Sequence, residues 1–279
     1  MIESSNLNVR RIAEYLSQKK RFDKRGLDEF RDIYIELGLS KKAEGSAKVK
    51  IGKTEVWVGV KLDLAEPYPD SPDKGNLVVT AELTPLSNSR YEYGPPKFEA
   101  VEIGRLVDRG IRESKYIQLD KLCIKKGEKV WNIFIDIYSI NDEGNLLDAA
   151  FIATLAALKD AKIPYYDEEN DKIDYDKDSK KKIPLNEEKM PLNFGVYQIG
   201  DFIFLDPTIE EESASEGKLV LAVTPENPIR ICSMQKGDTL EIEAEKFSEM
   251  LDLVEAKHKV LFPHINKLID DAIKHKAKK

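Results

Sequence analysis

The sequence is poor in the residues that most often build metal and nucleophilic sites. It holds two cysteines, Cys123 and Cys232, and three histidines among 279 residues. The cysteines lack CxxC or Cys/His spacing, which excludes the usual zinc patterns and disulfide frameworks and favours a reducing compartment. His258, His264 and His275 have no acidic partners at metal-ligand spacing, so we expect packing or surface roles for them. No metal or cofactor is expected.

Long apolar runs and phosphate-binding signatures are missing as well. No stretch approaches the roughly 20 apolar residues that a membrane-spanning helix needs. The opening residues, MIESSNLNVR, lack the charged and apolar regions of a signal peptide. No P-loop, GxGxxG motif or nucleophile elbow occurs. We therefore expect a cytoplasmic protein without a membrane partner.

Charged and apolar residues are both abundant. Apolar residues make up 41% of the chain and charged residues 34%, which predicts a packed core beneath a strongly charged exterior. The 44 basic and 51 acidic residues give a net charge of −7. Nucleic acid repels such a chain as a whole, so any contact with RNA must be local. The length is typical of two modest domains that share a core.

Residue periodicity divides the chain into four parts. They are an N-terminal helix or extension (residues 1–24), a first domain (25–164), a charged linker or insertion (165–190) and a second domain with a long C-terminal helix (191–279). Alternating apolar residues predict strands that include a hairpin around Gly52 and the segments 76–83, 130–140, 193–199, 202–205, 218–223 and 229–235.

Two helices are expected in the first domain, from about residue 97 to 115 and from about 145 to 162. Asn145, with Asp148 three residues on, has the pattern of an N-cap followed by an acidic first turn. The acidic run from Glu210 to Glu212, taken by itself, predicts only an exposed loop. The fold class is therefore α+β with two related βα domains.

Short motifs recur from Arg21 to the C-terminal helix. They are RFDKR from Arg21, GSA from Gly45, GKT from Gly52, PYP from Pro67 and GNL from Gly75. Together they resemble the RNase PH family, the phosphorolytic 3′-to-5′ exoribonucleases and their ring-forming relatives, although Lys24 replaces a usual glycine. The runs VDR from Val107 and GNLLDAA from Gly144 look closest to one branch of that family, the non-catalytic partner in the archaeal exosome ring.

The resemblance implies an RNase PH-like fold, with a ribosomal protein S5 domain 2-like first domain and an RNase PH C-terminal-like second domain. It also implies partners. They are a catalytic RNase PH-like paralogue, RNA-binding cap subunits and single-stranded RNA. Three heterodimers of this chain with the paralogue would close a hexameric ring.

The resemblance further implies that the catalytic positions are changed. Active members hold phosphate with two adjacent arginines, where this chain has Phe98 and Glu99, and with a Gly-Ser turn, where it has Gly144 and Asn145. Their two catalytic acids lie six residues apart. The first matches Glu212, and the second matches Lys218, which cannot ligate a divalent cation or replace the acid. We therefore expect no intrinsic catalysis.

Basic residues repeat at helical spacing in the segment from about residue 97 to 115. Arg105, Arg109, Arg112 and Lys115 fall on one face, which points away from the apolar face. Without the resemblance this is a solvated face with helix ion pairs. With it, Arg109, Arg112 and Lys115 are the candidate residues for gripping the RNA backbone.

Two other functions stay open on the sequence alone. The chain could be an active phosphate-dependent 3′-to-5′ exoribonuclease that uses Glu212 with another acid such as Asp206 or Glu216. It could also be a stand-alone RNA-binding module. An isolated chain that trims RNA in the presence of phosphate would favour the first, and a monomer that binds RNA tightly would favour the second.

Overall fold

The computed structural model describes residues 6–175, 177, 179–237 and 241–278 of the chain. The elements up to the middle of the chain are α1 (Asn6–Ser17), β1 (Ile33–Leu37), β2 (Gly45–Ile51), β3 (Thr54–Ala65), β4 (Asn76–Leu83), α2 (Phe98–Ser114), β5 (Cys123–Lys125), β6 (Lys129–Asn141) and α3 (Leu146–Asp160). Those that follow are β7 (Tyr165–Asp167), β8 (Lys172–Asp174), β9 (Leu192–Ile199), β10 (Phe202–Leu205), α4 (Ile209–Ala214), β11 (Gly217–Thr224), β12 (Arg230–Gly237) and α5 (Ala244–Lys276). Short 3₁₀ turns occur at Leu119–Leu122 and Glu187–Lys189.

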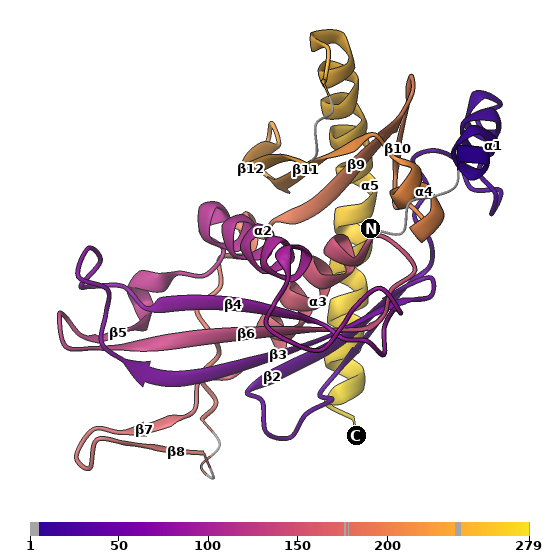
Figure 1. Cartoon of the computed structure of the whole chain (residues 1–279). Coiled ribbons are helices and arrows are strands. Elements are labelled where there is room, and N and C mark those ends of the chain that lie inside the picture. The colour runs from indigo at the N-terminus through magenta and orange to yellow at the C-terminus, as the bar shows by residue number, and fades with distance from the viewer. Residues whose placement is uncertain (1–5, 176, 178, 238–240, 279) are drawn as a thin grey trace.

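Two larger sheets frame the molecule, one mixed and one antiparallel (Figure 1). The larger sheet has the order β1-β2-β3-β6-β4, with β5 added beside β6, and the smaller one has the order β10-β9-β11-β12. Every pairing is antiparallel except that of β4 with β6. Because parallel neighbours need a crossover, the chain leaves β4, forms α2 and returns along β6. This crossover places α2 on one face of the larger sheet.

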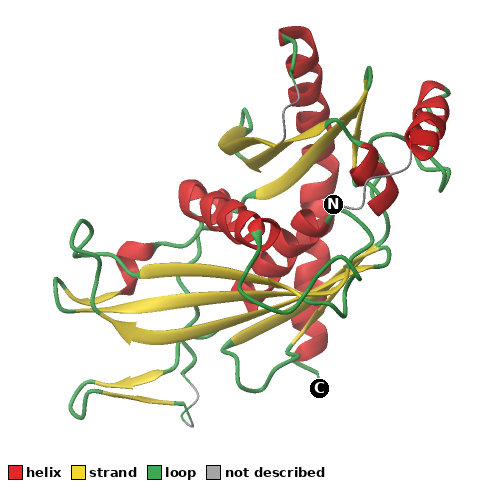
Figure 2. Ribbon diagram, viewed as in Figure 1, coloured by secondary structure: helices red, strands yellow, loops and turns green. Residues whose placement is uncertain are grey.

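The helices α2 and α3 lie between the two sheets, as the ribbon coloured by secondary structure shows (Figure 2). Residues 146–158 of α3 are all buried, which is possible because α3 contacts β2 and β3 on one side and β9 on another. The long helix α5 contacts both β1 and β9 and so runs past both sheets. One apolar cluster therefore extends through both halves of the chain.

A glycine sets how closely α2 packs. A Cβ built at Gly110 would lie 2.5 Å from the ring of Phe151 on α3 and 3.3 Å from Ala222 on β11. Any larger residue would push α2 away from both neighbours. The packed face of α2 also includes Val107 and Ile111. The opposite face of the helix, which carries the arginines, is left for solvent or for a partner.

Most elements predicted from periodicity are present. The hairpin around Gly52 is confirmed as β2 and β3, the strand at 76–83 matches β4, and the helix expected from about residue 97 ends at Ser114. The charged segment contains the hairpin β7 and β8. Among the described residues, no helix is both long and apolar enough to cross a membrane. The four-part division of the chain stays a prediction.

Candidate functional site

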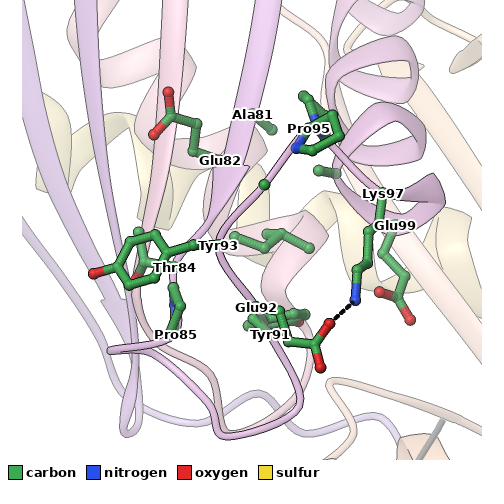
Figure 3. Close-up of a pocket in the computed structure, with 14 residues that line it drawn as sticks. Ala81, Glu82, Thr84, Pro85, Tyr91, Glu92, Tyr93, Pro95, Lys97 and Glu99 are labelled. Carbon is green, nitrogen blue, oxygen red and sulfur yellow. Dashed lines mark hydrogen bonds and ion pairs between the residues drawn. The ribbon is translucent and has the colours of Figure 1, made fainter.

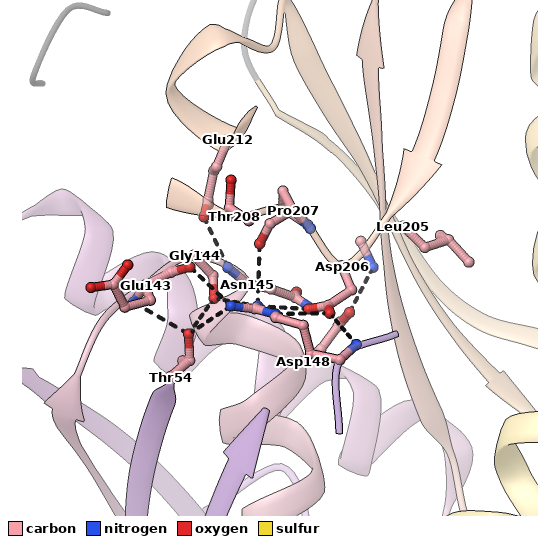
Figure 4. Close-up of polar contacts among 12 residues, drawn as sticks. Thr54, Glu143, Gly144, Asn145, Asp148, Leu205, Asp206, Pro207, Thr208 and Glu212 are labelled. Carbon is pink, nitrogen blue, oxygen red and sulfur yellow. Dashed lines mark hydrogen bonds and ion pairs between the residues drawn. The ribbon is translucent and has the colours of Figure 1, made fainter. Parts of the chain in front are cut away.

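The N-terminus of α3 meets the turn between β10 and α4, where polar contacts join the two halves of the chain (Figure 4). Gly144 and Asn145 both have left-handed backbones, with φ of 88° and 57°. A Cβ on Gly144 would lie 2.5 Å from the carbonyl carbon of Thr208, so only glycine fits this approach. The two segments are thus held in direct contact.

Asp206, at the end of β10, is the centre of this junction. It is fully buried, and its carboxylate accepts hydrogen bonds from Arg25 Nη1 (2.8 Å), Arg31 Nη2 (2.7 Å) and Asn145 Nδ2 (2.8 Å). The backbone N–H of Arg31 donates a further bond at 2.7 Å. Burial raises the pKa of Asp206, but the bonds and charge of Arg31 outweigh it and hold that pKa below its ordinary value. Asp206 is therefore a buried anion that clamps the two halves together.

A second buried pair lies beside the first. The side chain of Arg21, which is 2% exposed, donates from Nε to Glu211 Oε1 at 2.9 Å and from Nη2 to the Asp206 carbonyl at 2.7 Å. Glu211 also completes a capping box with Thr208 at the start of α4. The prediction of an exposed acidic loop from Glu210 to Glu212 was therefore wrong. The run forms a short helix, and Glu211 is buried because Arg21 neutralises it.

Glu212 turns its carboxylate toward the N-terminus of α3 (Figure 4). Its Oε2 accepts a bond from the backbone N–H of Asn145 at 3.0 Å, and its Oε1 accepts one from the Tyr197 hydroxyl at 3.3 Å. A helix N-terminus attracts anions through its free N–H groups and its dipole. The chain's own carboxylate thus occupies the position where the resemblance expects phosphate.

The prediction that Asn145 is the N-cap of α3, with Asp148 as an acid in the first turn, is confirmed. Asn145 stands at the cap position, but its side chain makes no cap bond and donates instead to Asp206. The left-handed backbone turns the amide away from the first helical N–H groups, and the buried carboxylate attracts it. Its side chain therefore joins the two halves of the chain, while its backbone begins α3.

Asp148 lies in the first turn of α3 and is also buried. Its carboxylate accepts hydrogen bonds from Asn193 Nδ2 at 2.7 Å and from the Gly195 backbone N–H at 3.4 Å. Burial raises its pKa to about 7, and the bond from Asn193 only partly opposes that rise. The pKa of Asp206 is lowered and that of Asp148 is raised. Of these two described carboxylates, Asp148 is therefore the one whose charge changes near neutral pH.

Lys218, on β11, forms an ion pair with Glu102 on α2. Its Nζ lies 3.2 Å from Glu102 Oε2, and the two side chains are 18% and 24% exposed. Lys218 lies opposite Tyr197 in the pairing of β11 with β9, and the Tyr197 hydroxyl donates to Glu212, so both positions neighbour Tyr197. Lys218 carries a positive charge that Glu102 neutralises within the chain.

Phe98 and Glu99, the first residues of α2, make no polar contact with this junction among the described residues. Phe98 is 78% exposed, and neither residue is hydrogen-bonded or ion-paired to Glu212 or Lys218 in the described part of the chain. A carboxylate at Glu99 would repel an incoming phosphate.

The basic face of α2, formed by Arg105, Arg109, Arg112 and Lys115, is exposed throughout. Arg112 pairs with Asp108 at 2.7 Å and donates to the Leu77 carbonyl at 3.1 Å. The side chains of Arg109 and Lys115 have no ion pair or hydrogen bond among the described residues. Lys115 ends the helix with a left-handed backbone (φ 58°). The face thus carries cations that the rest of the described chain leaves mostly uncompensated.

Sequence reasoning missed one polar group next to this region. The Tyr91 hydroxyl and Arg90 Nη2 both donate to Asp142 Oδ2 at 2.6 Å. Asp142 precedes the turn that begins α3, and its Oδ1 accepts a bond from the Gly144 N–H at 3.1 Å. No motif in the sequence marks Arg90, because its partner lies 52 residues away.

Two family models match the chain. The first domain of the 3′ exoribonuclease family covers residues 29–164, and its second domain covers residues 194–256. The chain belongs to the RNase PH family of 3′ exoribonucleases. The resemblance drawn from the short motifs and the RNase PH-like fold are both confirmed.

Similar RNase PH family members are archaeal exosome proteins. The chain is 44% identical to the exosome complex component Rrp42 of Methanothermobacter thermautotrophicus over 81% of this chain and 82% of that protein. It is 43% identical to the Rrp42 component of Methanocella arvoryzae over 90% and 92%. A chain from a structure of the Archaeoglobus fulgidus exosome with RNA bound to the active site superposes with a TM-score of 0.84 and 37% identity, over 93% of this chain and 98% of that one. The branch of the RNase PH family that the GNLLDAA run indicated is thereby confirmed.

Proposed function

We propose that this chain is a non-catalytic subunit of an archaeal exosome ring, which shapes the active site of its catalytic partner and binds RNA during phosphorolytic 3′-to-5′ degradation. One observation carries the proposal. The two residues that the resemblance matches to the catalytic acids both have partners inside the chain, because Glu212 binds the N-terminus of α3 and Lys218 pairs with Glu102. Neither is free to act on a phosphate. The cytoplasm is the expected location.

The partners are a catalytic RNase PH-like paralogue and RNA-binding cap subunits, with three heterodimers in a hexameric ring. The similarity to chains of archaeal exosome structures supports an assembly of this kind. Within it, Arg109, Arg112 and Lys115 hold the backbone of single-stranded RNA without reading its sequence. Their exposure supports this role, and so does the lack of internal partners for Arg109 and Lys115.

Phosphate-dependent trimming of end-labelled single-stranded RNA tests the division of labour. We expect no trimming by the isolated chain and release of nucleoside diphosphates by the assembly with the catalytic paralogue. Robust trimming by the isolated chain would make it the active exoribonuclease instead. Tight RNA binding by a monomer that never assembles would make it a stand-alone RNA-binding module.

Binding of the RNA backbone by these residues should also change how RNA affinity depends on salt concentration. Replacing Arg109, Arg112 and Lys115 with alanine removes three phosphate contacts, so the slope of log affinity against log salt should become shallower by about 2. Fluorescence anisotropy of labelled RNA on the assembled complex measures that slope. The matched control removes three exposed lysines of α5, namely Lys259, Lys267 and Lys274. An equal change of slope in both variants would contradict the assignment.

A further inference from the structure

The helix α1 and the turn that follows it carry positive charge that the rest of the chain does not balance. Five exposed cations here have no side-chain hydrogen bond or ion pair in the described part of the chain: Arg10, Arg11, Lys19, Lys20 and Lys24. Only two acids lie among them, Glu14 and Asp23, and Asp23 is already paired with Arg25 at 2.6 Å. We call residues 10–24 the α1 patch. In a chain with a net charge of −7, this patch is a local positive surface.

Two aromatic rings lie among these cations. Tyr15 and Phe22 are 37% and 46% exposed, and their rings meet edge to face with centroids 4.7 Å apart. The guanidinium carbon of Arg11 lies 5.9 Å from the centroid of the Phe22 ring. Exposed rings beside cations are the combination that holds single-stranded nucleic acid, because bases stack on the rings and the cations bind the phosphates.

The α1 patch is fixed to the second half of the chain. Ile12 and Leu16, on the apolar face of α1, are 2% and 0% exposed and pack in one cluster with Tyr197 and Phe204 of the smaller sheet. In the turn, the buried side chain of Arg21 is bonded to α4, which lies beside α1 (Figure 1). A surface held in this way needs little ordering when it binds a ligand.

The same packing excludes a membrane as the ligand. A basic amphipathic helix binds an anionic membrane by burying its apolar face at the boundary between headgroups and acyl chains. In α1 that face is already covered, because Ile12 and Leu16 pack against the smaller sheet. The cations and the exposed rings of Tyr15 and Phe22 are what remains for a partner.

The cavity beside the β4–α2 loop has the opposite charge (Figure 3). It measures about 230 Å³, and its wall carries the carboxylates of Glu82, Glu92 and Glu99. The only cation among its lining residues, Lys97, is already paired with Glu92 at 2.7 Å. Such a wall repels phosphate groups. A polyanion is therefore expected at the α1 patch and not at this cavity.

We infer that the α1 patch is a binding site for single-stranded RNA, separate from the basic face of α2. The inference rests on the proposed function only in taking RNA as the ligand, and it does not require the catalytic paralogue. Phosphates bind the unpaired cations, and a base stacks on the exposed ring of Phe22 or Tyr15. Neither contact reads the sequence of the RNA.

The first test removes charge from the isolated full chain. One variant combines Arg11→Gln, Lys20→Gln and Lys24→Gln, and fluorescence anisotropy follows the binding of labelled oligouridylate. Because three phosphate contacts are lost, we expect affinity at low salt to fall about 10-fold and the slope of log affinity against log salt to become shallower by about 2. The matched control replaces Lys259, Lys267 and Lys274 of α5 with glutamine and should bind like the wild type.

The second test removes only the ring. Phe22→Leu keeps an apolar contact with Tyr15 but has no ring for a base to stack on, so affinity should fall about 5-fold with an unchanged salt slope. The matched control is Tyr34→Leu, because Tyr34 is also an exposed ring (53%) with a cation, Lys48 Nζ, 5.8 Å from its centroid. It should bind RNA like the wild type. All altered side chains are exposed, so the thermal midpoints should not change.

Each outcome has a distinct meaning. If the three-cation variant of α1 loses no more affinity than its α5 control, the inference is wrong, while the proposed function stands on the contacts of α2. If that variant loses affinity but Phe22→Leu does not, the inference is also wrong, because an acidic protein segment would be held in the same way. Trimming of RNA by the isolated wild-type chain would contradict the proposed function and leave the comparison of α1 variants unaffected.

Discussion

The junction at the N-terminus of α3 and the exposed face of α2 use charge in opposite ways. At the junction, Asp206, Glu211 and Glu212 all have partners within the chain, and Asp206 alone receives bonds from Arg25 and Arg31. On α2, the side chains of Arg109 and Lys115 have none among the described residues. We propose that Glu212, which the resemblance matches to a catalytic acid, is structural in this chain, while Arg109 and Lys115 are left available for a partner. We therefore expect function where charged side chains lack a partner within the described chain, as on the exposed face of α2.

The comparison also explains why both regions tolerate their charges. Buried ions are costly unless they are paired and hydrogen-bonded, and the junction meets that condition with several bonds to each carboxylate. Exposed ions cost little, because water solvates them, and an isolated surface pair such as Arg112 with Asp108 adds at most about 1 kcal/mol. The two regions should therefore respond very differently to loss of a charge.

The largest expected effect is loss of the Asp206 carboxylate. Asp206→Asn leaves Arg25 and Arg31 without their buried anion, and breaking a buried pair from one side costs about 3–5 kcal/mol. Urea unfolding measures the change. Asp108→Asn, which removes the partner of Arg112 on the exposed face, is the matched control and should cost less than about 0.5 kcal/mol. Similar losses in both variants would remove the distinction between the two regions.

The next effect depends on pH. The pKa of Asp148 is raised to about 7, so the folded state holds a proton that the unfolded chain releases near pH 4. This contribution to stability is complete below about pH 4 and is lost as the pH rises to about 7, with a slope of at most about 1.4 kcal/mol per pH unit. Asp148→Asn removes it. Between pH 5 and 7, the wild type should lose about 2 kcal/mol relative to the variant.

Unfolding free energies of both proteins across that pH range provide the measurement. His258 acts in the opposite direction, because burial lowers its pKa and its contribution is lost as the pH falls below about 6.5. Both proteins carry His258, so the difference between them cancels its effect. A difference that stays constant with pH would show that Asp148 does not titrate in this range.

Sequence reasoning located the regular elements but not the junction. Strands such as β4 and the hairpin of β2 and β3 follow from local alternation, which each segment carries in itself. The ion pairs of the junction join Arg21 to Glu211 and Arg31 to Asp206, across 190 and 175 residues. No spacing rule connects residues so far apart. The motif beginning at Arg21 was found through the resemblance, but its role in holding the two halves together needed the fold.

Two missed elements did leave local signals. In β1, Ile33, Ile35 and Leu37 alternate with Tyr34 and Glu36, a period-2 pattern that predicts a strand. In α4, the spacing from Thr208 to Glu211 is that of a capping box, which indicates a helix start even when the helix is only six residues long. Recognising it would have predicted that the acidic run is ordered. Its burial would still have been missed, because Arg21 lies in another part of the sequence.

The smallest expected effect concerns the ion pair of Lys218 with Glu102, which lies where α2 meets the junction. Lys218→Asp places an acid at the position that the resemblance matches to the second catalytic acid of active family members. It also places two carboxylates next to each other, so we expect a loss of about 1 kcal/mol in unfolding free energy, since both side chains are only partly exposed and screening by water is incomplete.

Lys218→Met, which keeps the apolar stem beside Gly237, should lose less than Lys218→Asp. Neither variant should trim RNA in the presence of phosphate when tested as an isolated chain. Glu212 still occupies the N-terminus of α3, and Glu99 still stands where a phosphate-binding arginine is expected, so one restored acid has no phosphate to act on. Phosphate-dependent trimming by Lys218→Asp alone would mean that the junction is a latent active site rather than a structural clamp.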